Sequence, residues 1–193
     1  MRALATDGGS MALPRILVAG IGNIFLGDDA FGVEVVRRLS ARPLPDNVRV
    51  VDFGIRGFDL AYALLDSYDL TVLVDATPRG ESPGTLYAIE PEIDLPDGHE
   101  SEPMNIEMHG MDPAKVLAMV RAMGGEFRKI MLVGCEPAPL SAEELEHGSM
   151  GLSAPVSASV DDAVGMVESI IRKFLDEIGK NTGLRLDEKE GEP

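Results

Sequence analysis

The chain has 193 residues, of which 45% are hydrophobic and 26% charged, a composition typical of a globular domain that buries a core. With 17 basic and 33 acidic side chains its formal net charge is -16, which repels a phosphate backbone and argues against nucleic-acid binding. A cationic peptide, a basic protein surface or a metal ion is a better partner. Cys135 is the only cysteine, so intramolecular disulfides are excluded and a reducing, cytoplasmic location fits. No apolar run approaches the roughly 20 residues that a membrane span needs.

The two ends of the sequence differ in character from its middle. Residues 1–14 lack the apolar core of a signal peptide, and we expect a flexible extension there. Residues 180–193 are polar and aperiodic, as in a flexible acidic tail. No repeat or linker divides residues 15–179, for which we predict a single α/β domain.

Strand and helix patterns alternate along this domain. Apolar runs predict strands at Arg15 to Ala19, Val48 to Phe53, Leu70 to Asp75, Thr85 to Ile89 and Lys129 to Gly134. Helical spacing predicts helices at Asp28 to Ser40, Phe58 to Leu65, from Asp112 with Pro113 in its first turn, and Val160 to Ile178. The stretches of about 90–109 and 136–154 read as long loops, which are more often functional than decorative. The pattern predicts a three-layer sandwich: a mainly parallel, twisted sheet with helices on both faces.

Polar residues follow the predicted strands where each strand ends. Gly20 to Asn23 follow the first strand, Asp52 and Asp75 end the second and third, and Cys135 and Glu136 end the last. Ligands of open α/β sheets bind beyond the carboxyl ends of the strands. We therefore expect the functional site at this edge of the sheet.

The glycine-rich turn after the first strand is also how a dinucleotide-binding domain begins. The dinucleotide fingerprint needs a third glycine where Phe25 stands, although Asp52 could play the part of the acid that holds a ribose. Asp28 and Asp29 would lie near the helix N-terminus that a pyrophosphate must occupy, and two negative charges oppose that ligand. Nucleotide binding is therefore the weaker hypothesis.

A cation explains the same acidic residues better. A carboxylate at a helix N-terminus is stabilised by the helix dipole, and Asp75 at the end of a buried strand needs a cation or a donor as partner. His109 lies just before Asp112, so the following helix can fix its position. Two carboxylates and an imidazole suit nickel, zinc or a similar ion, with the other coordination positions open to substrate or water.

Each of these residues also has a simpler explanation. Asp28 or Asp29 can be a helix cap, Asp75 can cap the next turn, and His109 can be a surface histidine in a loop. Only their combination supports a metal site.

The other chemically interesting residues have less context. His99 and His147 lie in polar loops and are expected to be solvent-exposed, and Cys135 reads as a small buried residue that ends a strand. A cysteine nucleophile would want a nearby base, which the sequence does not place. A Ser–His–Asp triad is disfavoured because no Gly-x-Ser-x-Gly elbow is present.

Several motifs in order resemble one known family, the hydrogenase maturation proteases. They are ILVAGIGNIFLGDDAFGVEVVRRL, VDFGIRG, LTVLVDA, the histidine before KVLAMV, KIMLVGCEP and GLSAPVSASVDDAV, and the resemblance spans about residues 15–177. These endopeptidases trim the C-terminal extension from the large subunit of nickel–iron hydrogenases. Their fold is a twisted sheet between helices, in agreement with the pattern of the strands.

The resemblance also implies a site. The family residues associated with binding the nickel of the immature large subunit correspond to Asp29, Asp75 and His109. The first of them is often glutamate; Asp29 is one methylene shorter, so Asp28 could take its role. Nickel would be supplied by the substrate, with no permanent cofactor in the protease, and Asp29 or Asp75 would orient the attacking water. These carboxylates need not form an aspartic-protease dyad, because they come from separate strands and the Asp-Thr/Ser-Gly signature is absent.

The sequence thus predicts an endopeptidase that removes the C-terminal extension of a nickel-loaded hydrogenase large-subunit precursor. The alternative is a nickel carrier or docking module of hydrogenase assembly that does not hydrolyse its partner. Neither hypothesis involves nucleic acid or a membrane.

Overall fold

The computed structural model describes residues 13–91 and 113–182 of the chain. Five strands form one sheet in the order β2-β1-β3-β5-β4. They are β1 (Ile16–Ile21), β2 (Val48–Gly54), β3 (Leu70–Ala76), β4 (Leu86–Ile89) and β5 (Lys129–Cys135). The first three and β5 pair in parallel, whereas β4 pairs with β5 in antiparallel orientation. The carboxyl ends of the four parallel strands therefore meet at one edge, which we call the carboxyl edge.

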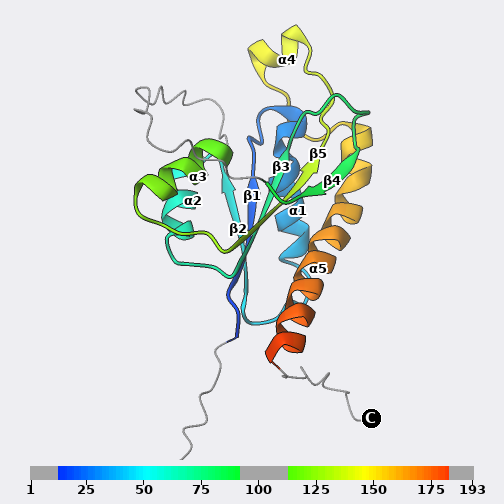
Figure 1. The fold of residues 1–193 in the computed structure, drawn as a ribbon. Coiled ribbons are helices and arrows are strands. Elements are labelled where there is room, and N and C mark those ends of the chain that lie inside the picture. Colours follow the sequence, from blue (N-terminus) through cyan, green and yellow to red (C-terminus); the bar gives the residue numbers. More distant parts are fainter. Residues whose placement is uncertain (1–12, 92–112, 183–193) are drawn as a thin grey trace, which may run out of the picture.

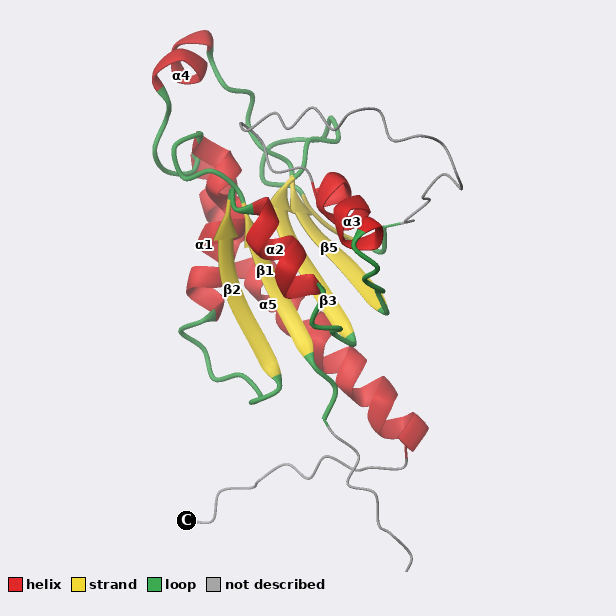
Figure 2. Ribbon diagram, turned by 90° about the vertical axis from the view of Figure 1, so that its left-hand side faces the viewer, coloured by secondary structure: helices red, strands yellow, loops and turns green. Residues whose placement is uncertain are grey.

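Helices cover both faces of the sheet, which confirms the predicted three-layer α/β sandwich. They are α1 (Phe31–Leu39), α2 (Gly57–Leu64), α3 (Pro113–Ala122), α4 (Ala142–His147) and α5 (Ala154–Thr182). In Figure 2, α2 and α3 lie in front of the sheet and α1 and α5 behind it. The short α4 stands beyond the carboxyl edge, at the top of Figure 1.

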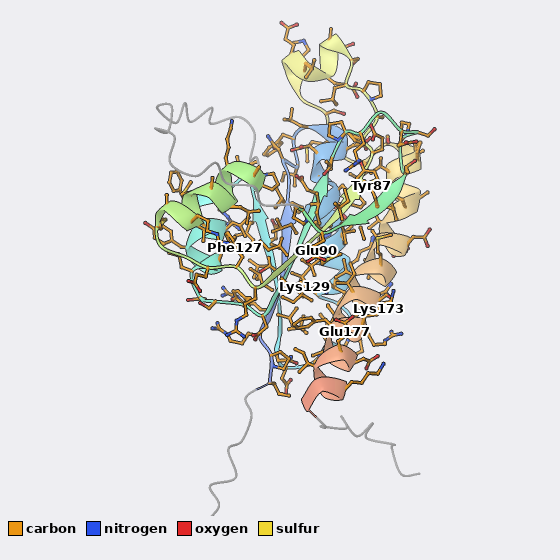
Figure 3. The ribbon with its side chains drawn as sticks, viewed as in Figure 1. Tyr87, Glu90, Phe127, Lys129, Lys173 and Glu177 are labelled. Atoms are coloured by element: carbon orange, nitrogen blue, oxygen red, sulfur yellow. The ribbon has the colours of Figure 1, made fainter. Side chains whose placement is uncertain are left out.

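The core is divided by the alternation of side chains along the strands. Ile16 and Val18 of β1 pack with residues of α1 and α5, whereas Leu17 and Ala19 pack with residues of α2 and α3. All four are fully buried, because a central parallel strand is covered on both faces. At the edge opposite the carboxyl edge, β5 begins with Lys129, whose ammonium group lies 3.8 Å from the carboxylate of Glu177 on α5. Both residues are labelled in Figure 3.

The predicted elements are present with shifted ends. The predicted helix from Asp28 begins instead as a 3-10 turn, η1 (Gly27–Ala30), that leads into α1. The last helix begins at Ala154 and not at Val160, because Pro155 suits a first helical turn and the buried Val156 extends the apolar face. Asp112, the expected cap of α3, lies outside the described residues.

Helix α4 lies within residues 136–154, for which the sequence pattern predicted only a loop. Ser141 accepts from the backbone N–H of Glu144, whose side chain accepts in return from the backbone N–H of Ser141. This reciprocal cap follows from the Ser-x-x-Glu pattern, which is a sequence signal for a helix start.

None of the helices in the described ranges has the length and apolar character required to cross a bilayer.

Candidate functional site

Two glycines bring α1 into direct contact with the sheet. A Cβ atom on Gly32 would lie 2.1 Å from the carbonyl oxygen of Val74 in β3 and 2.4 Å from that of Ile21 in β1. A Cβ atom on Gly20 would lie 2.5 Å from the carbonyl oxygen of Gly32. Only glycine allows this approach of backbone to backbone. As a result, the turn η1 with its two aspartates sits against the carboxyl end of β3, where Asp75 directly follows Val74.

The loop between β1 and η1 is built around Asp29. Gly22 has a φ of 133°, and a Cβ atom there would lie 1.7 Å from the carbonyl oxygen of Asp29. The carboxylate Oδ2 of Asp29 accepts from the backbone N–H of Asn23 at 2.6 Å, and the side chain of Asn23 accepts from the N–H of Phe25 at 3.0 Å. The side chain of Asp29 is thereby held over its own loop and does not cap the helix.

Asp29 occupies a position where its negative charge is poorly solvated. Burial raises the pKa of this carboxyl above its ordinary value, and the hydrogen bond from Asn23 opposes the rise only in part. Among the described residues, the hydrogen bonds found for its side chain involve Oδ2 alone. A cation placed here would relieve the cost of the charge.

Asp28, in contrast, is fully engaged inside the protein. Its side chain is 4% exposed, and it accepts from the N–H of Ser153 at 2.6 Å, from the hydroxyl of Ser153 at 2.8 Å and from the N–H of Ala138 at 2.8 Å. It therefore joins its own turn to two segments that lie more than 100 residues further along the chain. Asp28 is a structural clamp, neither a helix cap nor well placed to replace Asp29 as a ligand.

Asp75 is buried at the end of the central strand β3, with 8% of its surface exposed. It pairs in the sheet with Gly134 of β5, one residue before Cys135. This position agrees with the prediction that Asp75 lies at the carboxyl edge in a desolvated environment.

A second clamp, Glu136, holds the turn that follows β3. Its carboxylate accepts from the backbone N–H groups of Arg79 at 2.6 Å and Gly80 at 3.2 Å, and it lies 3.4 Å from the hydroxyl of Tyr87. Burial raises the pKa of Glu136, but the backbone N–H groups and the Tyr87 hydroxyl lower it more, so its pKa lies below the usual value. Burial and the neighbouring Glu136 in turn raise the pKa of Tyr87 to about 12. Tyr87 is labelled in Figure 3. The ionised Glu136 keeps the turn after β3 in place through its hydrogen bonds from Arg79 and Gly80.

An open cavity of about 340 Å³ lies at this edge, and we call it the rim cavity. It is lined by Leu26, Asp28, Asp29, Ala76, Pro78, Pro137, Ala138, Leu140 and Leu145. Asp29 and the neighbour of Asp75 thus belong to one cavity, although they come from different strand ends. Its volume falls at the lower end of the range of about 300–1,000 Å³ that is typical of ligand pockets.

A second cavity, of about 260 Å³, lies between the loops that follow β1 and β2. Asp52 contributes to its lining but is itself exposed, and its backbone carbonyl accepts from the guanidinium of Arg56. Cys135 is fully buried, with its Sγ atom 3.5 Å from the hydroxyl of Ser159, and burial raises the pKa of its thiol. It is the small buried residue that the sequence indicated. A nucleophilic cysteine needs a lowered pKa and access to the substrate, whereas the thiol of Cys135 is buried and its pKa is raised.

The structure brings two of the three proposed metal ligands, Asp29 and Asp75, to the same edge. His109 lies outside the described residues, as does His99, so the three-ligand site stays a prediction. Within residues 13–91 and 113–182 there is no group of three or more histidine, cysteine or acidic residues that could hold a metal. His147, at the end of α4, is exposed as expected.

Sequence reasoning missed the two clamps and the apolar walls of the rim cavity. The sequence around a single acid such as Glu136 does not indicate which backbone N–H groups will donate hydrogen bonds to it. The walls come from loops after three different strands and from α4, and only the cap pattern at Ser141 announces one of them.

Comparison with known proteins identifies the family of this arrangement. Residues 33–170 match the family model described as HycI, hydrogenase maturation protease. The hydrogenase 2 maturation protease of Escherichia coli K12 is 32% identical over 160 residues, which cover 82% of this chain and 92% of that protein. The hydrogenase expression/formation protein HupD of Rhizobium leguminosarum is 32% identical over 162 residues, which cover 83% and 76% of the two chains.

Solved structures agree with the sequence matches. The hydrogenase maturating endopeptidase HybD from E. coli aligns with a TM-score of 0.64 at 30% identity, over 82% of this chain and 93% of that one. The hydrogenase 2 maturation peptidase from a Thaumarchaeota archaeon aligns with a TM-score of 0.57 at 30% identity, over 89% and 99%. The chain therefore belongs to the hydrogenase maturation protease family, whose members are endopeptidases that act in hydrogenase maturation.

Proposed function

We propose that this endopeptidase removes the C-terminal extension from a nickel-loaded hydrogenase large-subunit precursor, and that the nickel already in the substrate is its recognition element. Asp29, Asp75 and His109 would hold the ion. The metal belongs to the substrate, so the protease needs no cofactor of its own. Family membership favours this reading over the nickel carrier, which would not hydrolyse its partner.

One observation carries the proposal: the contact of Gly32 with β1 and β3 sets Asp29 and Asp75 at the same edge of the sheet. Both carboxylates are partly or largely removed from water there, and burial already raises the pKa of Asp29. A divalent ion would offset the cost of burying the negative charge of Asp29. His109 enters only through the resemblance of its motif.

Nickel in the substrate makes cleavage conditional on metal insertion. The attraction between carboxylates and ion exists only when the ion is present, so an empty precursor loses that part of the recognition energy. The ion would also position the nearby peptide bond and polarise its carbonyl. Asp29 or Asp75 would then orient the attacking water.

A processing assay tests the gating. The protein is incubated with nickel-loaded and with empty precursor, and the substrate mass is followed by mass spectrometry. We expect a shortened chain from the loaded precursor alone. Equal cleavage of the two precursors would contradict the role of nickel, and an unshortened loaded precursor would contradict the proteolytic step.

The residues are tested by single alanine variants of Asp29, Asp75 and His109. Each should abolish processing and leave the circular dichroism spectrum unchanged. His147→Ala is the matched control, because His147 is an exposed histidine outside the proposed site. Full activity in all three site variants would reject the assignment.

The charge of the chain suggests how the precursor is attracted. With a net charge of -16, the protease should associate faster with a basic surface around the substrate's tail, and this rate should fall as salt is added. We place the reaction in the cytoplasm, the reducing compartment that suits the lone, buried Cys135.

A further inference from the structure

The rim cavity has a second character beside its carboxylates. Seven of its nine lining residues are leucine, proline or alanine, and none is basic. Asp28 is the most deeply buried of its acids, and three donors of the protein already occupy that carboxylate. The remaining surface of the cavity is thus suited to apolar atoms.

The walls of the cavity are arranged so that one side is fixed and the other is exposed. The fixed side includes Pro78 and Pro137, next to the segments that Glu136 and Asp28 hold. The other side includes Leu145 of α4, whose surface is 65% exposed. No residue of α4 is buried, and Met150 just beyond it is 75% exposed. Large apolar side chains exposed beside a cavity are typical of a surface that a partner covers.

We propose that the rim cavity is a substrate subsite, which accepts one apolar side chain of the polypeptide next to the bond that is cut. This inference rests on the proposed function, since it is the position of Asp29 and Asp75 at the same edge that places the cut bond here. About 340 Å³ suffices for one large side chain with its backbone but not for a folded element. Leu145 covers this side chain from the outer wall.

The charge of the site selects the class of side chain. An acidic residue would meet Asp29 and the strongly negative protein as a whole, so it is rejected. A basic residue would be attracted by Asp29, but its charged group would have to leave water for a cavity whose walls are mostly apolar. We therefore expect valine, leucine, isoleucine or methionine to be preferred over both acidic and basic residues.

A cross-linker attached to the outer wall tests where the precursor binds, and it does so without requiring cleavage. Cys135 is fully buried, so in the Leu145→Cys variant the introduced thiol is the reactive one and takes a maleimide photo-cross-linker. With nickel-loaded precursor, we expect cross-links to the segment that contains the cut bond. Met123→Cys is the matched control, because Met123 is 44% exposed and follows α3. Cross-links elsewhere on the precursor, to a second copy of the protease or to the protease's own chain would overturn the subsite.

Kinetics test the chemistry of the occupant. Residues on either side of the cut bond are replaced one at a time by leucine, serine, aspartate and lysine, and kcat/KM is measured. At one of these positions we expect leucine to exceed serine by about tenfold, a typical effect in an apolar pocket. Leu145→Ser should lower the ratio of kcat/KM between the leucine and serine substrates by raising KM for the leucine substrate. Met123→Ser should leave this ratio unchanged.

The outcomes separate the subsite from the proposed function. If the wild-type protein does not shorten the precursor, the proposed function fails, and the cross-link map still decides whether the cavity holds the segment. If it does shorten the precursor but shows no apolar preference at any flanking position, or prefers lysine, the subsite is wrong and the proteolysis stands.

Discussion

The two walls of the rim cavity are built on opposite principles. The inner wall is held by the buried carboxylates of Asp28 and Glu136, which accept hydrogen bonds from segments far apart in the sequence. The outer wall is α4, which has no buried residue and stabilises itself through the capping box of Ser141 and Glu144. At its far end, Ser149 joins the first loop by backbone hydrogen bonds with Phe25 and Gly27.

The difference indicates a division of labour. Ligands of an ion need fixed positions, and Asp29 and Asp75, the two described residues that we propose as ligands, stand on the fixed side. A wall that accepts a side chain of a partner benefits from weak attachment, because segments with little buried surface open at low free-energy cost. Four substitutions test this difference between the two walls, and they follow from the largest expected effect on stability to the smallest.

Gly32→Ala should break the fixed side most severely. The new Cβ atom would lie 2.1 Å from a backbone oxygen of β3, so α1 must move away from the sheet and carry Asp29 with it. We expect a loss of about 3 kcal/mol in the free energy of unfolding, measured by urea denaturation, together with loss of processing.

The matched control for this substitution is Gly165→Ala in α5. No atom lies within 4 Å of a Cβ atom at Gly165, so alanine should stabilise the helix by about 0.5–1 kcal/mol. A tolerated Gly32→Ala would show that the contact between helix and sheet does not set the site.

Asp28→Asn tests the clamp itself. The amide keeps the shape but presents an NH₂ group to donors from Ser153 or Ala138, so at least one buried donor loses its acceptor. We expect a loss of about 2 kcal/mol in the free energy of unfolding and a lower kcat/KM. Asp161→Asn, an exposed acid paired with Arg38, should change stability by less than about 0.5 kcal/mol. Similar losses in both variants would remove the special role of Asp28.

Asp29→Asn should increase the stability of the protein at neutral pH, whereas Asp28→Asn should decrease it. The folded protein raises the pKa of Asp29, so the unfolded chain ionises first as the pH rises above the ordinary value of 3.8. The contribution of this group to stability therefore falls between that value and the raised pKa and stays low at neutral pH. The asparagine variant, which keeps the acceptor for Asn23, should be more stable than the wild type at pH 7 but not at pH 3, and inactive. Thermal denaturation at the two pH values checks this, and a less stable variant at pH 7 would be the contrary result.

Ser141→Ala should affect only the outer wall. Loss of the cap costs α4 about 1 kcal/mol, which should appear as faster amide hydrogen exchange in α4. The global midpoint of thermal unfolding should stay unchanged because α4 contributes no buried residue. A lowered midpoint would mean that the two walls are one cooperative unit.

Much of the fold could be predicted from the sequence because its signals are local. Continuous apolar runs announced the strands, and Pro113 announced the start of α3. The start of α5 at Ala154 was missed because Val156 is the only buried residue of its first turn, so the apolar period becomes visible only at Val160. The Ser-x-x-Glu cap of α4 was present in the sequence and was overlooked.

The candidate site, like the fold, could be predicted from the sequence only in part. Asp29 and Asp75 could be proposed because strand ends in a parallel sheet share an edge, whereas the engagement of Asp28 by Ser153 spans 125 residues. Two adjacent aspartates look equivalent in sequence, and their hydrogen bonds alone separate a clamp from a candidate ligand.

The sequence by itself determined the alternation of strands and helices, the excess of negative charge and the order of motifs that marks the family, because each depends on residue type and spacing. The tertiary structure alone decided which aspartate is clamped, how closely α1 approaches the sheet and that an apolar cavity adjoins the carboxylates. These features depend on backbone atoms and side chains that meet only when the chain is folded, and no local pattern records such distances.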